Sequence, residues 1–288
     1  MKIMIGFLNI NKPAGMSSAR VVGIIKKRFH LDKVGHMGTL DPLASGVLPI
    51  AINKATRMFD YFQEKTKTYT AWFTFGKTTA TLDLEGDFIE FSDIIPTVNE
   101  INAKLSDFVG EIEQMPPMYS AKKVDGVCAY KLARENVDFY LNPKKIVVVD
   151  FKLTKQISND TFEFEIECGS GTYIRSLARD LAKSLNTVGY MSKLVRTKSG
   201  FFTLQNSLSI EDVENQKELS NIITPIEKVF SKIKIQNLDE KDTKKLCDGQ
   251  DISTTLSNGS YFILCQNELV CVAYVVDKSM KLKTYLKG

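Results

Sequence analysis

The sequence contains little of what metal centres and disulfide frameworks are built from. Its 288 residues include two histidines, His30 and His36, and five cysteines without a Cys-x-x-Cys pair. An odd number of unpaired cysteines predicts reduced thiols, and two histidines can hardly supply a His-based metal site. The chain also lacks a Gly-x-Gly-x-x-Gly motif and a P-loop. We therefore expect no metal and no cofactor.

Long hydrophobic runs are absent as well. No segment approaches the roughly 18 apolar residues that span a bilayer, and polar residues interrupt the opening segment at Asn9, Asn11 and Lys12. With 43% apolar and 25% charged residues, the composition is that of an ordinary folded protein. We expect a cytoplasmic protein without a membrane partner, built from one large domain and a smaller appendage.

The positive charge is unevenly distributed. Residues 1–70 carry 11 basic and 4 acidic side chains and residues 121–200 carry 14 and 9, whereas residues 71–120 carry 2 and 9. Lysines and arginines neutralise phosphates, and aromatic rings stack on unpaired bases, so this pattern favours a surface for looped or single-stranded RNA. Solvated surface faces remain an alternative on charge alone. Aromatic residues within these two basic blocks or directly next to them include Tyr69, Tyr119, Tyr130, Tyr173 and His36.

Hydrophobic periodicity predicts alternating helices and strands up to about residue 230. A segment containing an Asp-Gly turn signal, about residues 115–144, interrupts this pattern and predicts a protruding lobe. Beyond residue 230 the pattern changes to short strands with one helix, so we place a domain boundary there. The predicted helices are 18–30, 172–185 and 239–246, and the main predicted strands are 47–52, 67–76, 162–168, 261–265 and 269–276.

Asp41 is the strongest candidate for chemistry. It lies in Leu40-Asp-Pro-Leu43, with no other acid within eight residues on either side. Aspartate before proline often caps a helix, so a cap remains an alternative, although Gly46 and Pro49 follow too closely for a good helix. If Asp41 is buried it needs a cation. Arg175 is the expected partner because it falls in the first turn of a predicted helix, where the macrodipole disfavours positive charge.

Tyr69 and His36 each have a structural and a functional interpretation. Tyr69 begins the apolar face of its predicted strand, where tyrosine is more often part of a core than of a site, but at a strand end it can stack on a base. His36 follows Gly35, and glycine permits a ligand to approach closely. A structural histidine is an equally good interpretation.

Five motifs in the sequence identify a family resemblance. They are residues 11–18 (NKPAGMSS), 35–48 (GHMGTLDPLASGVL), 67–69 (KTY), 118–122 (MYSAK) and 171–175 (GTYIR). In order and spacing they closely resemble the motifs of the bacterial TruB family of tRNA pseudouridine-55 synthases. The resemblance covers about residues 6–205, whereas the last 58 residues resemble the family's C-terminal domain only weakly.

The resemblance implies an α+β pseudouridine synthase fold, with a mixed, mainly antiparallel sheet flanked by helices. Residues 1–230 would form the catalytic domain, with an inserted RNA-gripping thumb at about 115–144, and residues 231–288 a small β-rich, PUA-like RNA-binding domain. The implied reaction converts uridine 55 in the T loop of tRNA to pseudouridine by base flipping. The implied partner is the tRNA T stem-loop, and we expect a monomer.

The resemblance also implies roles for individual residues. Asp41 would be the catalytic aspartate and Arg175 its partner, while the ring of Tyr69 would pack on the target base. His36 would enter the space that the flipped nucleotide leaves, and Leu194 would form an apolar wall. The complete set of implied substrate-binding residues is His36, Tyr173, Leu194 and Lys12.

Two positions depart from the family pattern. Met37 stands where threonine is usual, and Ala80 stands where aspartate is usual in Thr79-Ala-Thr81. Neither is one of the implied pocket residues, so we expect them to change local contacts near the RNA rather than the reaction.

Two other functions remain as alternatives. An RNA-binding or tRNA-folding module with secondary or lost catalysis would share every basic and aromatic feature, and only Asp41 with Arg175 distinguishes it from an enzyme. An aspartate-based hydrolase would require a second carboxylate near Asp41.

Overall fold

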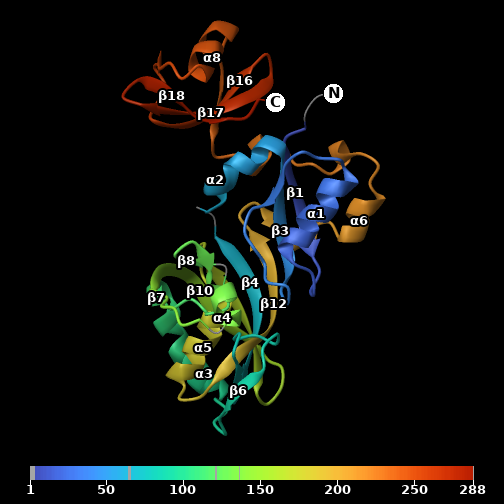
Figure 1. Ribbon diagram of the computed structural model, residues 1–288. Helices are drawn as coiled ribbons and strands as arrows, with labels where there is room; N and C mark the ends of the chain where they lie inside the picture. Colours follow the sequence, from blue (N-terminus) through green and yellow to red (C-terminus); the bar gives the residue numbers. More distant parts are fainter. Residues whose placement is uncertain (1–3, 64–65, 121, 136, 288) are drawn as a thin grey trace.

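A nine-stranded mixed sheet forms the body of the molecule. The computed structural model describes residues 4–63, 66–120, 122–135 and 137–287 (Figure 1). The strands of this sheet are β1 (Gly6–Lys12), β2 (Val34–His36), β3 (Ser45–Ile52), β4 (Lys67–Phe75), β7 (Gly110–Gln114), β10 (Lys144–Gln156), β11 (Thr161–Cys168), β12 (Gly189–Ser199) and β13 (Phe202–Thr203). Their order is β1-β3-β12-β4-β11-β10-β7, with β2 added to β3 and β13 to β12. Strands β3 and β12 run parallel and the other neighbouring pairs run antiparallel.

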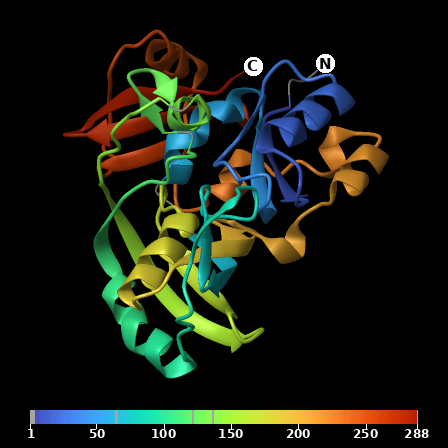
Figure 2. The ribbon, with the colours of Figure 1, turned by 60° about the horizontal axis from the view of Figure 1, so that its bottom comes forward.

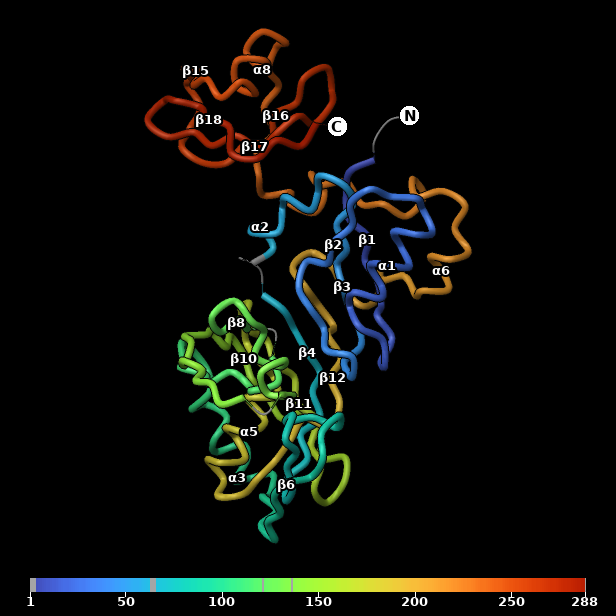
Figure 3. Tube along the Cα trace, in the orientation of Figure 1, coloured from blue at the N-terminus to red at the C-terminus, as the bar shows by residue number. Residues whose placement is uncertain are grey.

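Helices cover this sheet in two groups. The helices of the body are α1 (Ser18–Arg28), α2 (Phe59–Gln63), α3 (Val98–Leu105), α4 (Ala129–Arg134), α5 (Ile174–Ser184), α6 (Ile210–Asn215) and α7 (Ile226–Val229). Helices α3 and α5 lie next to each other against the β4–β11–β10 part (Figure 2), and their apolar side chains join its core. Helix α1 lies beside α6 near β1 and β3 (Figure 3).

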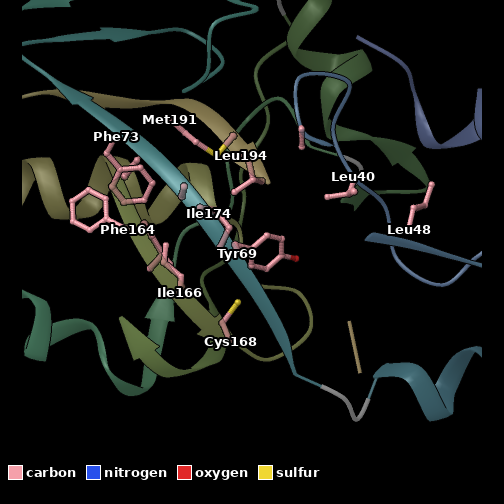
Figure 4. Packing of buried hydrophobic residues seen from close by; sticks show 14 of the residues in the cluster. Leu40, Leu48, Tyr69, Phe73, Phe164, Ile166, Cys168, Ile174, Met191 and Leu194 are labelled. Carbon is pink, nitrogen blue, oxygen red and sulfur yellow. The ribbon is translucent and has the colours of Figure 1, made fainter. Parts of the chain in front are cut away.

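Strand β4 shows why the alternating segment 67–76 folds as expected. Its odd-numbered side chains Tyr69, Ala71 and Phe73 are buried, while the intervening residues are more exposed. Figure 4 shows this face packed with Phe164 and Ile166 of the neighbouring strand β11. Period-two alternation of this kind is what a strand with one face toward the core requires.

Strand β1 contributes to two separate cores because both of its faces are buried. Leu8 and Ile10 pack with α1 in the main core. Phe7 points the other way, into a second cluster with Phe62 of α2 and Phe230, at ring-centroid distances of 5.1 and 5.9 Å. Alternate residues of a strand point to opposite faces, so one short strand can join two clusters.

The segment after residue 230 forms a sheet of its own. Its elements are β14 (Lys234–Asn237), α8 (Glu240–Cys247), β15 (Ile252–Ser253), β16 (Gly259–Cys265), β17 (Glu268–Val276) and β18 (Ser279–Tyr285). The strand order is β14-β16-β17-β18-β15. Phe262, Val272 and Leu286 from this part belong to the same buried cluster as Phe7 and Phe230. A shared apolar cluster therefore joins the C-terminal sheet to the body.

The predicted lobe at residues 115–144 contains a small hairpin and a helix. Strands β8 (Lys123–Val124) and β9 (Val127–Cys128) pair around Asp125 and Gly126, and α4 follows at once. Residues 121 and 136 of the lobe lie outside the described residues. A second hairpin, β5 (Lys77–Thr79) with β6 (Phe88–Phe91), projects from the end of β4. Across the described chain, no helix combines the length and apolar content needed to cross a bilayer.

Candidate active site

An open pocket of about 450 Å³ lies where β4, β12, the start of α5 and the Asp41 loop meet. Five of the implied site residues line this pocket, and His36 and Lys12 do not. The lining residues are Thr39, Leu40, Asp41, Tyr69, Thr172, Tyr173, Ile174, Arg175, Met191 and Leu194.

Asp41 does not cap a helix. The backbone N–H of Ala44 donates to the Asp41 carbonyl at 3.1 Å, which closes a tight turn, and strand β3 begins directly afterwards at Ser45. The helix-cap interpretation of Asp-Pro is therefore wrong. The Asp41 carboxylate therefore caps no helix, and the side chain is 36% exposed at the pocket.

The backbone of the Asp41 loop is held on both sides by buried side chains. Arg196 is almost completely buried and donates to the carbonyls of Gly38 at 3.1 Å and Thr39 at 3.3 Å. The Ser18 hydroxyl accepts from the Leu40 N–H and donates to the Leu40 carbonyl, both at 2.9 Å. Fixing the loop in this way before substrate arrives is what a preorganised site requires.

Lys12 is a support of this loop. Its Nζ donates to the carbonyls of Pro13, Met16 and Pro42 at 2.9, 2.5 and 3.2 Å. Burial lowers the pKa of Lys12 to about 8, and the nearby Asp41 partly opposes that shift. Because all three ammonium donors have carbonyl acceptors, Lys12 holds the Pro42 side of the loop.

Arg175 is the centre of the charged part of the site. Its guanidinium lies 3.0 Å from an Asp41 carboxylate oxygen and 3.3 Å from one of Asp83, and it also donates to the carbonyls of Thr81 and Tyr119 at 2.9 and 3.1 Å. One planar cation thus joins the Asp41 loop, the Asp83 turn and the base of the lobe. The expected pairing of Asp41 with Arg175 is present in the structure.

Asp41 pairs with Arg175 although it is only partly buried. The fully buried carboxylate is Asp83, whose side chain is 2% exposed. It accepts from the Thr81 hydroxyl at 2.6 Å and from the Glu85 N–H at 3.0 Å. The sequence analysis missed Asp83, although it lies three residues after Ala80, within a segment that the family comparison had already drawn attention to.

Tyr69 and Leu194 form an apolar side of the pocket. Figure 4 shows both side chains between the Phe73–Phe164 core and Leu40. Both are buried, and they belong to the main core as well as to the pocket. Burial raises the pKa of Tyr69, while the neighbouring Arg196 acts in the opposite direction. The structural and functional interpretations of Tyr69 are therefore compatible.

Gln114, which the sequence analysis did not single out, positions Tyr173. Its side-chain oxygen accepts from the Tyr173 N–H at 2.8 Å, and its side-chain nitrogen donates to the Tyr173 carbonyl at 3.1 Å. Gln114 is 2% exposed. This clamp ties the start of α5, and with it Arg175, to strand β7.

His36 lies on strand β2 and does not line the Asp41 pocket. It is half-buried, its Nδ1 has no hydrogen-bond partner among the described residues, and burial lowers its pKa. The nearby Arg196 acts in the same direction. A neutral imidazole at the edge of the site can approach a ligand without adding charge.

A second open space of about 1450 Å³ adjoins the first and extends beneath the lobe. Asp41, Asp83 and Arg175 border it on one side, and Tyr130 and Arg134 of α4 border it on the other. Burial raises the pKa of Glu85 in this space, and the charges of Asp83 and Asp41 add to the effect. The lobe therefore forms a wall opposite the Asp41 loop.

The two departures from the family pattern lie outside the Asp41 pocket. Met37 is 2% exposed and packs with Phe7 in the second apolar cluster. Ala80 is exposed and borders the space beneath the lobe. Met37 thus replaces a polar residue inside a core, where its apolar side chain is well accommodated.

The architecture is that of pseudouridine synthases. A solved H/ACA ribonucleoprotein bound to a substrate RNA containing 2′-deoxyuridine matches with a TM-score of 0.72 and 22% identity, over 98% of this chain and 85% of that chain. A crystal structure of a Cbf5–Nop10–Gar1 complex matches with a TM-score of 0.72 and 25% identity, over 100% and 85%. These similarities define the fold class.

The chain belongs to the TruB family of pseudouridylate synthases. The family's N-terminal domain matches residues 26–174, and the tRNA pseudouridylate synthase B C-terminal domain matches residues 175–231. The tRNA pseudouridine synthase B of Caulobacter sp. (strain K31) is 40% identical over 86% of this chain and 81% of its own length. That of Caldanaerobacter subterraneus subsp. tengcongensis is 38% identical over 96% and 97%.

Proposed function

We propose that this protein isomerises uridine 55 in the T loop of tRNA to pseudouridine, with Asp41 as the catalytic residue. The observation that carries the proposal is the Asp41–Arg175 pair at 3.0 Å beside a pocket walled by Tyr69 and Leu194. Membership of the TruB family and the names of its relatives support the same reaction on tRNA.

The reaction exchanges one bond to the sugar for another. The N1–C1′ bond of the uridine breaks, the uracil turns within the pocket, and C5 bonds to C1′. N1 then gains a proton and C5 loses one, so the product is an isomer of the substrate. The Asp41 carboxylate either attacks the sugar or removes the C2′ proton, and in both cases Arg175, 3.0 Å away, holds its orientation.

The remaining site residues receive binding roles under this proposal. The target base must leave its stack, at a cost of a few kcal/mol, and Tyr69 and Leu194 then pack on it. Tyr173 contributes a further wall, His36 occupies the space that the nucleotide leaves, and Lys12 supports the loop. Recognition then depends on the shape of the RNA loop.

The parts of the chain receive roles as well. Residues 1–230 form the catalytic domain, the lobe at about 115–144 grips the RNA as a thumb, and residues 231–288 form a PUA-like domain that binds RNA. We propose a monomer that acts on the T stem-loop. A tRNA substrate supports a cytoplasmic location.

Asp83 is not the second reactive carboxylate that the hydrolase alternative requires. This second carboxylate is close to Asp41, but it does not line the pocket and its oxygens accept from Thr81, Glu85 and Arg175. It is therefore a structural partner of Arg175. The binding-module alternative is disfavoured by the family match and by the exposed carboxylate of Asp41.

Tritium release tests the proposal directly. A tRNA transcript tritiated at uracil C5 should lose label at one position per molecule, and carbodiimide primer extension should map that position to residue 55. Asp41→Asn should release none while binding the transcript. Release from another position, or wild-type binding without release, would refute the proposed reaction.

A further inference from the structure

A third open pocket, of about 1000 Å³, lies between the body and the C-terminal sheet. It is formed by α2, the end of β12, the segment after α7, and strands β16 and β18. Among the described residues no Asp or Glu lines it. Its polar lining includes Tyr61, Lys198, Ser231, Lys232, Ser260 and Lys283.

The pocket concentrates uncompensated positive charge. Lys198 and Lys232 have neither an ion pair nor a side-chain hydrogen bond with any other described residue. Lys283 is held over the Tyr61 ring, 4.9 Å from its centroid, and 5.9 Å from the ring of Tyr274. Like charges that share a pocket repel one another, and an anion bound between them would remove that repulsion.

The Tyr61 hydroxyl gives an independent indication of a ligand. It is shielded from solvent and has no hydrogen-bond partner among the described residues. A buried hydroxyl without a partner costs about 1–3 kcal/mol. An acceptor oxygen that reached this hydroxyl, after a shift of the Lys283 side chain that lies over the Tyr61 ring, would receive its proton and remove the cost.

The pocket lies along the same two strands as the Asp41 site. Lys198 of β12 pairs with Thr68 of β4, next to the pair formed by Arg196 and Tyr69. Lys198 follows Leu194 by four residues, which is at most roughly 13 Å at the rise of a β-strand. A ligand here would lie close to an RNA whose base is in the Asp41 pocket.

We propose that this pocket binds a backbone phosphate of the RNA whose uridine enters the Asp41 pocket. The Tyr61 hydroxyl donates to a phosphate oxygen, and Lys198, Lys232 and Lys283 supply the positive field. An open pocket next to the substrate site suits a polymer better than a free nucleotide. The inference rests on the proposed function in taking RNA as the ligand.

Tyr61→Phe is the sharpest test because it removes one oxygen and keeps the ring. The dissociation constant for a fluorescein-labelled T stem-loop, measured by anisotropy, should rise about three- to tenfold, the range for one hydrogen bond. The melting temperature of the free protein should stay the same or rise, because the hydroxyl has no partner to lose. The kcat at saturating RNA should not change.

Charge substitutions test the field of the pocket. Lys198→Gln, Lys232→Gln and Lys283→Gln should each weaken binding and lower the slope of log K against log salt by about 0.7–0.9. Lys155→Gln is the matched control, because Lys155 is an exposed lysine of β10 and does not line the pocket. It should leave both quantities unchanged.

Three results would overturn the proposal. One is an unchanged dissociation constant for Tyr61→Phe, and another is an equal loss in Lys155→Gln. The third is binding of inorganic phosphate that the four pocket variants abolish without any effect on RNA affinity, since the pocket would then serve a small anion. Binding is measured without turnover, so failure of wild-type tritium release contradicts the proposed reaction separately.

Discussion

Arg175 is shared by two carboxylates whose surroundings differ. Asp41 faces the pocket and is 36% exposed, whereas Asp83 is 2% exposed and has two further donors. A buried guanidinium is costly without compensating charge. The buried carboxylate of Asp83 balances the positive charge of Arg175 at all times, so the Asp41 carboxylate can keep one side open to substrate. The two residues should therefore respond differently to the same substitution.

Asp41→Asn should abolish isomerisation with little change in stability. The substitution removes the reactive oxygen charge from a partly exposed position and leaves the Arg175–Asp83 pair in place. We expect tRNA affinity within several-fold of wild type and a similar melting temperature. Residual turnover above about 1% of wild type, a loss of less than about 2.7 kcal/mol in transition-state stabilisation, would contradict the catalytic assignment.

Asp83→Asn should lower the melting temperature as well as the activity. Removing one partner of a buried ion pair costs about 3–5 kcal/mol, and the remaining Asp41 should reduce that cost. Thermal unfolding of both asparagine variants provides the comparison. Equal melting temperatures for Asp41→Asn and Asp83→Asn would show that the two carboxylates are equivalent, contrary to their exposures.

Arg175→Lys should restore only part of the activity lost in Arg175→Met. A lysine ammonium can pair with one carboxylate, but it cannot reproduce the planar fork that joins Asp41, Asp83 and two carbonyls. We expect lower kcat for both variants at saturating tRNA. A surface phosphate contact would instead raise KM, and the loss would shrink at low salt.

Lys67 should make stability depend on pH above neutrality. Burial lowers its pKa to about 8 from 10.5, with Arg196 adding to the shift. Between those values the unfolded chain binds more protons, so this residue's contribution to stability rises with pH across that window. Urea unfolding of wild type and Lys67→Met at pH 7.5 and 9.5 should show a difference that moves in favour of wild type at the higher pH.

At the level of elements, the parallel contact between β3 and β12 positions the Asp41 loop. Gly46 of β3 pairs with Arg196 of β12 and has a φ of +101°. A Cβ at this position would lie 2.3 Å from the Arg196 carbonyl oxygen. Only glycine allows these two backbones to approach so closely.

Gly46→Ala should therefore destabilise the protein more than Gly15→Ala. Gly15 also has a positive φ, of +78°, but nothing lies within 4 Å of its added Cβ. Gly15→Ala should cost only the backbone strain, about 1–2 kcal/mol, whereas Gly46→Ala must also separate β3 from β12. Denaturant midpoints of the two variants give the test, and equal losses would contradict the close-contact argument.

Elements with clear periodicity were predictable and those without it were not. The buried residues of strand β4 recur with the period of a strand, and the apolar residues of helix α5 recur with the period of a helix, so both elements were expected. Strand β6 is exposed at every position and pairs only with β5, and its sequence therefore carries no alternating signal. The pairing of Asp41 with Arg175 was inferred from two arguments. One was the unfavourable position of a cation in the first turn of a helix, and the other was the family motif. Asp83 and Gln114 act through contacts that exist only after folding, so no local sequence pattern predicted their roles in the site.

At the level of the whole molecule, the predicted boundary near residue 230 does not isolate two independent cores. Phe262, Val272 and Leu286 pack with Phe7 and Phe230 across it. Within the body, Phe7 and Thr224 exchange backbone hydrogen bonds of 2.8 and 2.7 Å, which fix the strand that presents Phe7 to this cluster. The C-terminal sheet is thus part of the body's stability in addition to its proposed role in binding RNA.

Removing residues 233–288 should consequently lower stability even though every implied site residue is retained. The truncation exposes to water the ring faces of Phe7 and Phe230 that pack against the C-terminal sheet. Phe262→Ala in the full chain tests the same contact without truncation, and truncating a buried phenylalanine costs about 3–5 kcal/mol. Calorimetry should give a lower melting temperature in both proteins. An unchanged value for Phe262→Ala would show that the cluster does not couple the two parts.

The contact between Phe7 and Thr224 also has a consequence for biosynthesis. The outer partner of strand β1 is translated more than two hundred residues after the strand itself. At typical rates of about 5–20 residues per second, the first strand waits roughly 10 to 45 seconds for that partner. During this interval a nascent chain exposes Phe7 and an unpaired strand edge, which is a surface that chaperones can bind.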